Sequence, residues 1–114
     1  MTRRRGWRTA LVRETYLIAP EAEGDLKQIW RYLLGEAGLA IANRIQGELV
    51  DAFEGLADVP GKGHQRPDLA NREVLFFSVY QYMIVYRQAA TVEIVAVLHG
   101  KRDLKRLLKA RLPK

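Results

Sequence analysis

The sequence reads YMIVYR from Tyr82 to Arg87 and VEIVAVLH from Val92 to His99. Both runs are apolar over most of their length and rich in β-branched and aromatic residues, which is typical of strands covered on both faces. The short linker around Ala89 predicts that they pair as a hairpin. The first run ends on a cation and the second on a titratable histidine. We therefore expect Arg87 and His99 to lie at one rim of the sheet, where polar groups would carry the function.

Strand and helix patterns continue on both sides of this pair. A strand at Glu73 to Phe77 would complete an antiparallel meander with strands at Tyr82 to Gln88 and Val92 to Leu98. Downstream, the basic segment from Arg102 to Arg111 has leucines at helical intervals, which predicts a short helix docked through its leucines.

The first half of the chain predicts a strand and two helices. Thr15 to Ala19 is β-branched, aromatic and apolar, and Pro20 then suits the first turn of a helix that Gly35 and Gly38 would end. A second amphipathic helix is expected from about Leu39 to Leu56, and the short turn predicts an antiparallel helical hairpin. The expected fold is α+β: an N-terminal strand, a helical hairpin on one face of a three-stranded antiparallel meander, and a short basic C-terminal helix.

Composition excludes several classes of protein. The chain has 114 residues, no cysteine and only two histidines, so we expect no metal and no cofactor. We expect one domain over residues 15–112, preceded by a basic flexible arm at residues 1–14. No apolar run is long enough to span a membrane, and a cytoplasmic location is the default expectation.

The net charge of +6 is unevenly distributed. Residues 1–14 carry a net +4, residues 99–114 a net +6, and residues 15–98 a net −4. A basic terminus is typical of a protein that meets nucleic acid or an acidic protein segment, although a solvated tail that maintains solubility would have the same charge.

The order of these elements, with the phrases Tyr82 to Arg87 and His99-Gly100-Lys101-Arg102-Asp103, resembles the ParE branch of the ParE/RelE toxin superfamily over about Tyr16 to Arg111. The resemblance implies the toxin of a type II toxin-antitoxin system, which would arrest growth by poisoning DNA gyrase, a bacterial type II topoisomerase. It also implies neutralisation by a ParD-like antitoxin in a hetero-oligomer, with operator DNA contacted only through the antitoxin.

Two other functions remain open. RelE-like relatives cleave mRNA, and here Arg66, Arg72, Arg87 and His99 would supply the cations and the acid or base. The predicted second helix carries four acidic residues against the single cation Arg44, which opposes binding of an RNA backbone, so an enzyme is not the favoured hypothesis. A toxin-like domain that has lost activity and serves as a binding module is the third possibility.

The candidate site is therefore the C-terminal segment. Its cations would bind the target: Lys101, Arg102, Lys105, Arg106 and Lys109. Its leucines Leu104, Leu107 and Leu108 would fasten it to the domain and contribute to antitoxin binding. Two residues of the predicted sheet have structural explanations as well as functional ones. Arg87 could simply pair with Glu93 across the hairpin, and His99 could be an ordinary residue at a strand end.

Overall fold

The computed structural model describes residues 16–70 and 73–112. The elements, in chain order, are β1 (Tyr16–Ile18), α1 (Pro20–Ala37), α2 (Leu39–Asp58), the short 3-10 helix η1 (Pro60–Lys62), β2 (Val74–Val79), β3 (Tyr82–Arg87), β4 (Val92–His99) and α3 (Leu104–Arg111). Within those residues, no helix is both long enough and apolar enough to cross a membrane. The predicted arm at residues 1–14 lies outside the described part of the chain.

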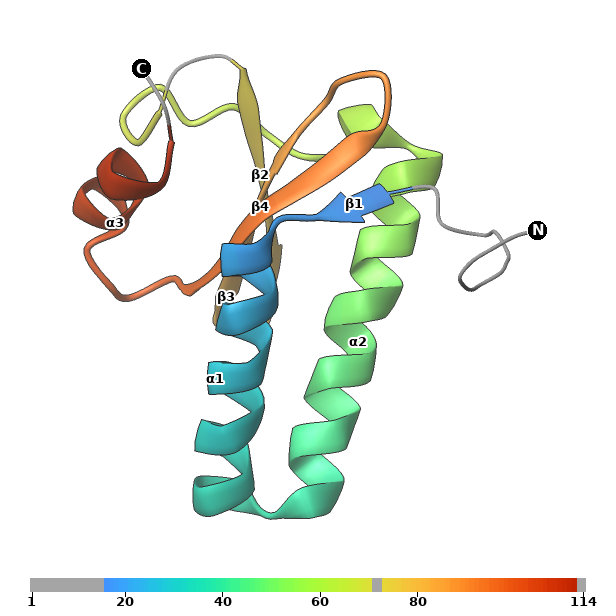
Figure 1. Cartoon of the computed structure of the whole chain (residues 1–114), viewed down its shortest axis with the longest axis vertical. Helices are drawn as coiled ribbons and strands as arrows, with labels where there is room; N and C mark the ends of the chain where they lie inside the picture. The colour runs from blue at the N-terminus through green and yellow to red at the C-terminus, as the bar shows by residue number, and fades with distance from the viewer. Residues whose placement is uncertain (1–15, 71–72, 113–114) are drawn as a thin grey trace.

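The four strands form one sheet in the order β1-β4-β3-β2. β2, β3 and β4 make the predicted antiparallel meander. β1 pairs in parallel with β4 at residues 92–94, a partner that the sequence did not indicate. Figure 1 shows the helical hairpin of α1 and α2 running past the sheet, while α3 lies apart from the hairpin. The predicted α+β architecture is confirmed.

Local sequence explains where α1 begins and ends. Pro20 occupies the first turn, where its missing N–H costs no hydrogen bond, and Glu21 and Glu23 place negative charge at the positive end of the helix dipole. Gly38 is the only residue between the two helices, and its φ of 93° is one that glycine adopts without strain. Gly35 lies inside α1, so the prediction that it helps to end the helix is wrong.

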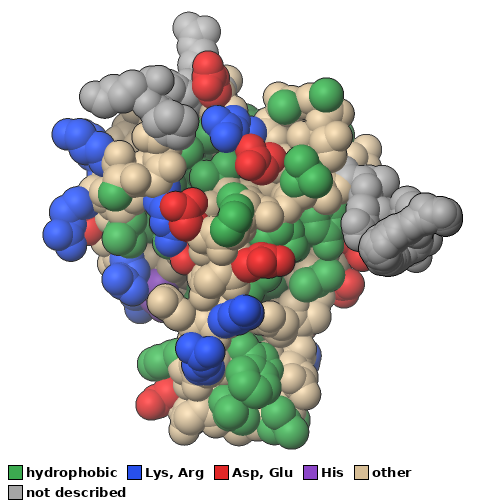
Figure 2. Space-filling view, in the orientation of Figure 1, with side chains coloured by type: hydrophobic (Ala, Val, Ile, Leu, Met, Phe, Trp, Pro, Cys, Tyr) green, Lys and Arg blue, Asp and Glu red, His purple; other side chains and the backbone are tan. Residues whose placement is uncertain are grey.

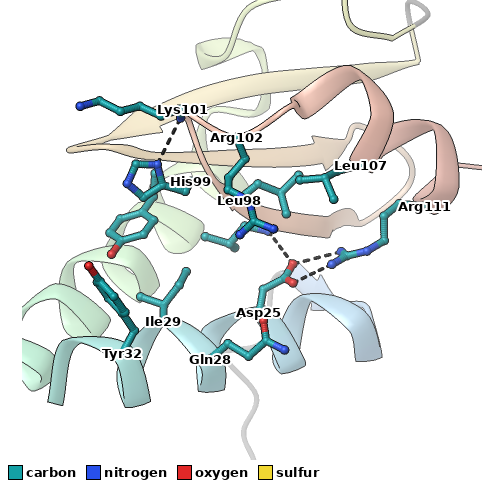
Figure 3. Close-up of a pocket in the computed structure, with 12 residues that line it drawn as sticks. Asp25, Gln28, Ile29, Tyr32, Leu98, His99, Lys101, Arg102, Leu107 and Arg111 are labelled. Carbon is teal, nitrogen blue, oxygen red and sulfur yellow. Dashed lines mark hydrogen bonds and ion pairs between the residues drawn. The ribbon is translucent and has the colours of Figure 1, made fainter. Parts of the chain in front are cut away.

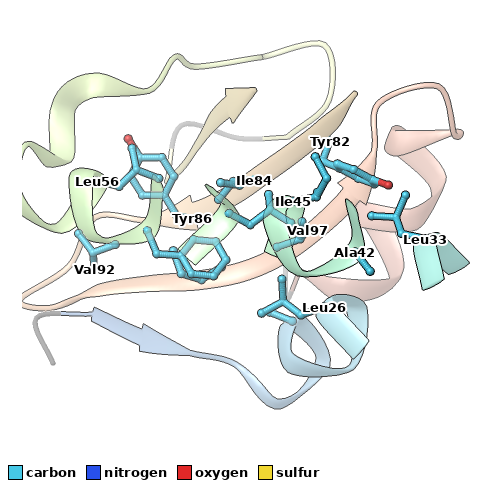
Figure 4. Close-up of a cluster of buried hydrophobic side chains, with 14 residues drawn as sticks. Leu26, Leu33, Ala42, Ile45, Leu56, Tyr82, Ile84, Tyr86, Val92 and Val97 are labelled. Carbon is cyan, nitrogen blue, oxygen red and sulfur yellow. The ribbon is translucent and has the colours of Figure 1, made fainter. Parts of the chain in front are cut away.

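The helical hairpin covers one face of the sheet through a core of buried apolar side chains (Figure 4). α2 contributes the predicted stripe at helical spacing, and its members Leu49, Phe53 and Leu56 are fully buried. Tyr82 and Tyr86 on β3 point into the same core, because side chains alternate between the faces of a strand with a period of two residues. Buried tyrosines also bring a hydroxyl group that must find a hydrogen-bond partner.

A second, smaller core lies on the opposite face of the sheet, under α3. A register shift between Val85 and Tyr86 leaves one extra residue on β4, so that the consecutive residues Val95 and Ala96 both face this core. β4 is consequently buried on both faces over most of its length. This double burial explains the continuous apolar run in its sequence.

The loop that follows α2 is held against the sheet by Tyr86. The Tyr86 hydroxyl donates to the carbonyl oxygen of Pro60 at 2.6 Å and accepts the N–H of Gly63 at 2.9 Å. His64 then makes two backbone hydrogen bonds of 2.8 Å with Phe76 on β2. This bridge occupies the middle of an outer strand edge that would otherwise be open to pairing with another chain.

Gly63→Ala is expected to destabilise the protein. A Cβ atom at Gly63 would lie 2.5 Å from the Tyr86 hydroxyl oxygen and 2.9 Å from the Phe76 carbonyl oxygen, and overpacking of this kind costs about 1–3 kcal/mol. Gly61→Ala is the matched control, because a Cβ atom there meets no atom within 4 Å. Urea unfolding of both variants measures the difference, and equal stabilities would contradict this account of the loop.

Candidate functional site

Arg87 and His99 lie at opposite ends of the sheet. In the antiparallel register of β3 and β4, Arg87 is opposite Glu93 and His99 is opposite Tyr82. At a strand rise of about 3.3 Å per residue, these two ends of β3 are roughly 16 Å apart. The prediction of a common rim is therefore wrong, because neighbouring antiparallel strands end at opposite edges.

Two of the other candidates for a ribonuclease site, Arg66 and Arg87, each pair with a carboxylate. Arg87 donates to the Glu93 carboxylate at 3.0 Å. This cross-strand ion pair is the structural role that the sequence also allowed for Arg87. Arg66 pairs with Asp68 in the exposed loop before β2, at 2.9 Å and 3.1 Å. These hydrogen bonds raise the pKa of Arg66 and lower the pKa of Asp68. Arg72 lies outside the described residues.

His99 sits where β4 ends and the chain turns towards α3. Its Nδ1 accepts the backbone N–H of Lys101 at 3.1 Å, so the neutral ring carries its proton on Nε2. Its ring meets the Tyr82 ring edge to face, with centroids 5.7 Å apart. Burial raises the pKa of the Tyr82 hydroxyl. The histidine therefore has a role in packing and in shaping the turn.

All five of the predicted target-binding cations are exposed to solvent. They are Lys101, Arg102, Lys105, Arg106 and Lys109. Figure 2 shows blue side chains gathered at the left edge of the molecule, over α3. Asp103 begins α3 by accepting the backbone N–H of Arg106 at 3.2 Å, a normal N-cap. We call these five exposed cations the basic face.

The leucines of α3 fasten it to the sheet, as predicted. Leu104 and Leu108 belong to the second core and have almost no exposed surface, whereas Leu107 is only half-buried. Antitoxin binding by Leu104 and Leu108 stays a prediction, and in this conformation both side chains are buried against the sheet. Leu107 alone of the three is accessible.

An ion pair that the sequence did not reveal joins α1 to the end of α3. Asp25 on α1 accepts two hydrogen bonds from the Arg111 guanidinium, at 2.6 Å and 3.0 Å, and one from the backbone N–H of Val97 at 2.9 Å. β1 ends before this point of β4, so the carboxylate takes the place of a strand partner. The hydrogen bonds between the Arg111 guanidinium and Asp25 raise the pKa of Arg111.

A groove of about 590 Å³ opens beside this ion pair. It lies between α1, the end of β4 and α3 (Figure 3). Its apolar lining comes from side chains of all three elements, among them Ile29, Leu98 and Leu107, and its cations include Lys101 and Arg102. No group of three or more potential metal ligands occurs in the described residues. This combination of apolar walls and cations is suited to holding an apolar side chain that has a negatively charged group next to it.

These features define a small α+β domain with a basic helix on one face of its sheet and a helical hairpin on the other. The family model described as the ParE toxin of the type II toxin-antitoxin system, parDE, matches residues 16–104. The chain therefore belongs to the ParE toxin family.

A solved structure agrees with this assignment. A chain from the chromosomal ParDE toxin-antitoxin system of P. aeruginosa superposes with a TM-score of 0.66 at 17% identity, covering 75% of this chain and 95% of that one. At this identity the likeness shows the fold. No curated protein sequence matches the chain.

Proposed function

We propose that this ParE-family toxin inhibits DNA gyrase through the basic face and is neutralised by a ParD-like antitoxin. Family membership supports the toxin role. The basic face is a suitable site for binding gyrase, since its five exposed cations lie on one short helix and the turn before it. A dense cluster of cations raises the rate and the selectivity of binding to a negatively charged partner.

The observation that carries the choice of target is the separation of Arg87 from His99. A ribonuclease site needs its base, acid and phosphate-binding cations within hydrogen-bond reach of one phosphodiester. Here the two residues lie at opposite ends of β3 and β4, and Arg87 is neutralised by Glu93. The exposed acidic side chains Asp51 and Glu54 on α2 would also repel an RNA backbone.

The antitoxin is the second partner in this proposal. Antitoxins of this kind pair a DNA-binding part with a segment that folds on the toxin, which allows a large surface to be covered at a cost in ordering entropy. The complex would meet its operator DNA through the antitoxin. A domain that only binds an antitoxin and no longer acts on gyrase would not arrest bacterial growth when it is induced.

Induction of the protein in bacteria is expected to arrest growth and to leave plasmid DNA relaxed. Reversal of two cations, Lys105→Glu with Arg106→Glu, should greatly reduce the arrest, because it changes the basic face by four charge units. Both side chains are exposed, so the free energy of unfolding should change by no more than about 0.5 kcal/mol.

The matched control for this experiment is Lys27→Glu with Arg31→Glu. It makes the same change of charge at two exposed positions of α1, which carries none of the five cations of the basic face. Growth curves, protein level and melting temperature are measured for each variant. Full toxicity of the Lys105 and Arg106 double variant at undiminished expression would show that the basic face is only a solvated surface.

A further inference from the structure

We propose that Tyr80, in the turn between β2 and β3, contacts gyrase directly and adds an aromatic anchor beside the basic face. This proposal rests on the proposed function, because it names a further contact residue for the same target. Three properties of Tyr80 support the role: its backbone conformation, its exposure and its place next to the basic face.

The backbone of Tyr80 has a conformation that tyrosine rarely adopts. Val79 pairs with Tyr82, so Tyr80 and Gln81 form a two-residue turn. Such turns need a positive φ at their first residue, where glycine is preferred. Tyr80 has a φ of 56° and is alone in this among the non-glycine residues that the structure describes. The turn explains the conformation but not the tyrosine, since glycine or asparagine would fit with less strain.

Packing within the domain does not explain the tyrosine either. Tyr80 is 59% exposed and belongs to neither core. Its hydroxyl donates a hydrogen bond to Glu48 on α2, which is the main reason why the pKa of Tyr80 is raised. A hydrogen bond in contact with water adds little stability, because both groups can bond to water instead. The bond does hold the ring in one place, which reduces the entropy that is lost when a partner binds.

The turn that carries Tyr80 is joined to the start of the basic face. Gly100 donates its backbone N–H to the carbonyl oxygen of Gln81 at 2.7 Å. Lys101, the first cation of the basic face, follows Gly100 directly. The exposed ring and the basic face therefore adjoin at this end of the sheet.

Tyrosine has the properties of an interface anchor. Protein interfaces are enriched in tyrosine and arginine, and a few such residues provide most of the binding energy. The basic face would attract gyrase over a long range, and the Tyr80 ring would supply a short-range contact at its edge. The backbone strain fits this role, because unfavourable conformations cluster at functional sites.

Tyr80→Asn separates a role in the fold from a role in binding. Asparagine tolerates a positive φ better than tyrosine does, so the variant should melt roughly 2–5 °C higher than the parent. Its gyrase inhibition should nevertheless weaken by about tenfold or more. Tyr80→Phe keeps the ring and should inhibit almost as well as the parent. The control is Val59→Asn, because Val59 is similarly exposed, at 56%, and lies beyond the end of α2; it should inhibit as the parent does.

A photo-crosslinker tests for direct contact. p-Benzoylphenylalanine in place of Tyr80 should crosslink to purified gyrase, and in place of Val59 it should not. A crosslink that forms between two copies of this chain, and not to gyrase, would overturn the proposal.

The inhibition assay separates this proposal from the proposed function. A parent chain that does not inhibit gyrase would overturn both. Undiminished inhibition by Tyr80→Asn beside an inhibiting parent would overturn only the role of Tyr80. A lower melting temperature for Tyr80→Asn would show that the tyrosine serves the fold, and a loss of inhibition in Tyr80→Phe as large as in Tyr80→Asn would contradict the role of the ring.

Discussion

Asp25→Ala is expected to lower the free energy of unfolding by about 3–5 kcal/mol, the usual cost of removing one partner from a buried ion pair. The Asp25 side chain is 9% exposed and the Arg111 side chain 22%, so solvent screens the pair only weakly. The substitution would leave the guanidinium without its carboxylate. It would also leave the backbone N–H of Val97 without its acceptor.

Glu23→Ala is the control for that variant, because Glu23 is an exposed carboxylate in the same part of α1. Its removal should change stability only through the helix dipole, by about 0.3–1 kcal/mol. Urea unfolding of both variants gives the comparison. Similar losses in the two would show that Asp25 contributes no more than any charge near the start of α1.

Leu108→Ala is the second substitution with a large expected effect. Leu108 is 1% exposed in the core under α3, and truncation of a buried leucine to alanine costs about 2–5 kcal/mol. Leu107→Asp should also destabilise, because an unpaired charge is costly against apolar surface. Its effect is limited by the partial exposure of Leu107 at the groove.

Lys109→Ala serves as the control for the Leu108 variant, since the neighbouring side chain is exposed and should change stability by no more than about 0.5 kcal/mol. Thermal unfolding and hydrogen exchange of α3 are the measurements. A Leu108 variant as stable as the Lys109 variant, with α3 equally protected, would mean that α3 is not held by its leucines.

Much of the fold follows from local pattern in the sequence. Periodicity places α1, α2 and the three strands of the meander to within a few residues, and the apolar run of β4 correctly indicates burial on both faces. Tyr82 and Tyr86 are correctly placed in the core. These features depend on residues close together in the chain, whose spacing is visible without the structure.

Features that depend on distant residues could not be predicted in this way. Three residues of β1 carry no pattern that selects β4 as a parallel partner. Asp25 looks like one more acidic residue near a helix start, although its position three residues after the buried Ala22 puts it on the inner face of α1. Its partner Arg111 follows 86 residues later, and no spacing rule connects them.

The error over Arg87 and His99 has a different origin. The hairpin that joins β3 to β4 was itself predicted, and antiparallel strands must end at opposite edges of a sheet. The sequence therefore held enough information to separate these two residues. The burial of Leu104 and Leu108, by contrast, follows from the helical spacing that predicts docking of α3.

The most direct test of the proposed function is a DNA supercoiling assay with purified gyrase and the purified full-length chain. If the proposed function is correct, the protein inhibits supercoiling or traps cleaved DNA, Lys105→Glu with Arg106→Glu abolishes this effect, and mRNA stays intact on ribosomes. Unaffected supercoiling together with ribosome-dependent mRNA cleavage that His99→Ala abolishes would contradict it.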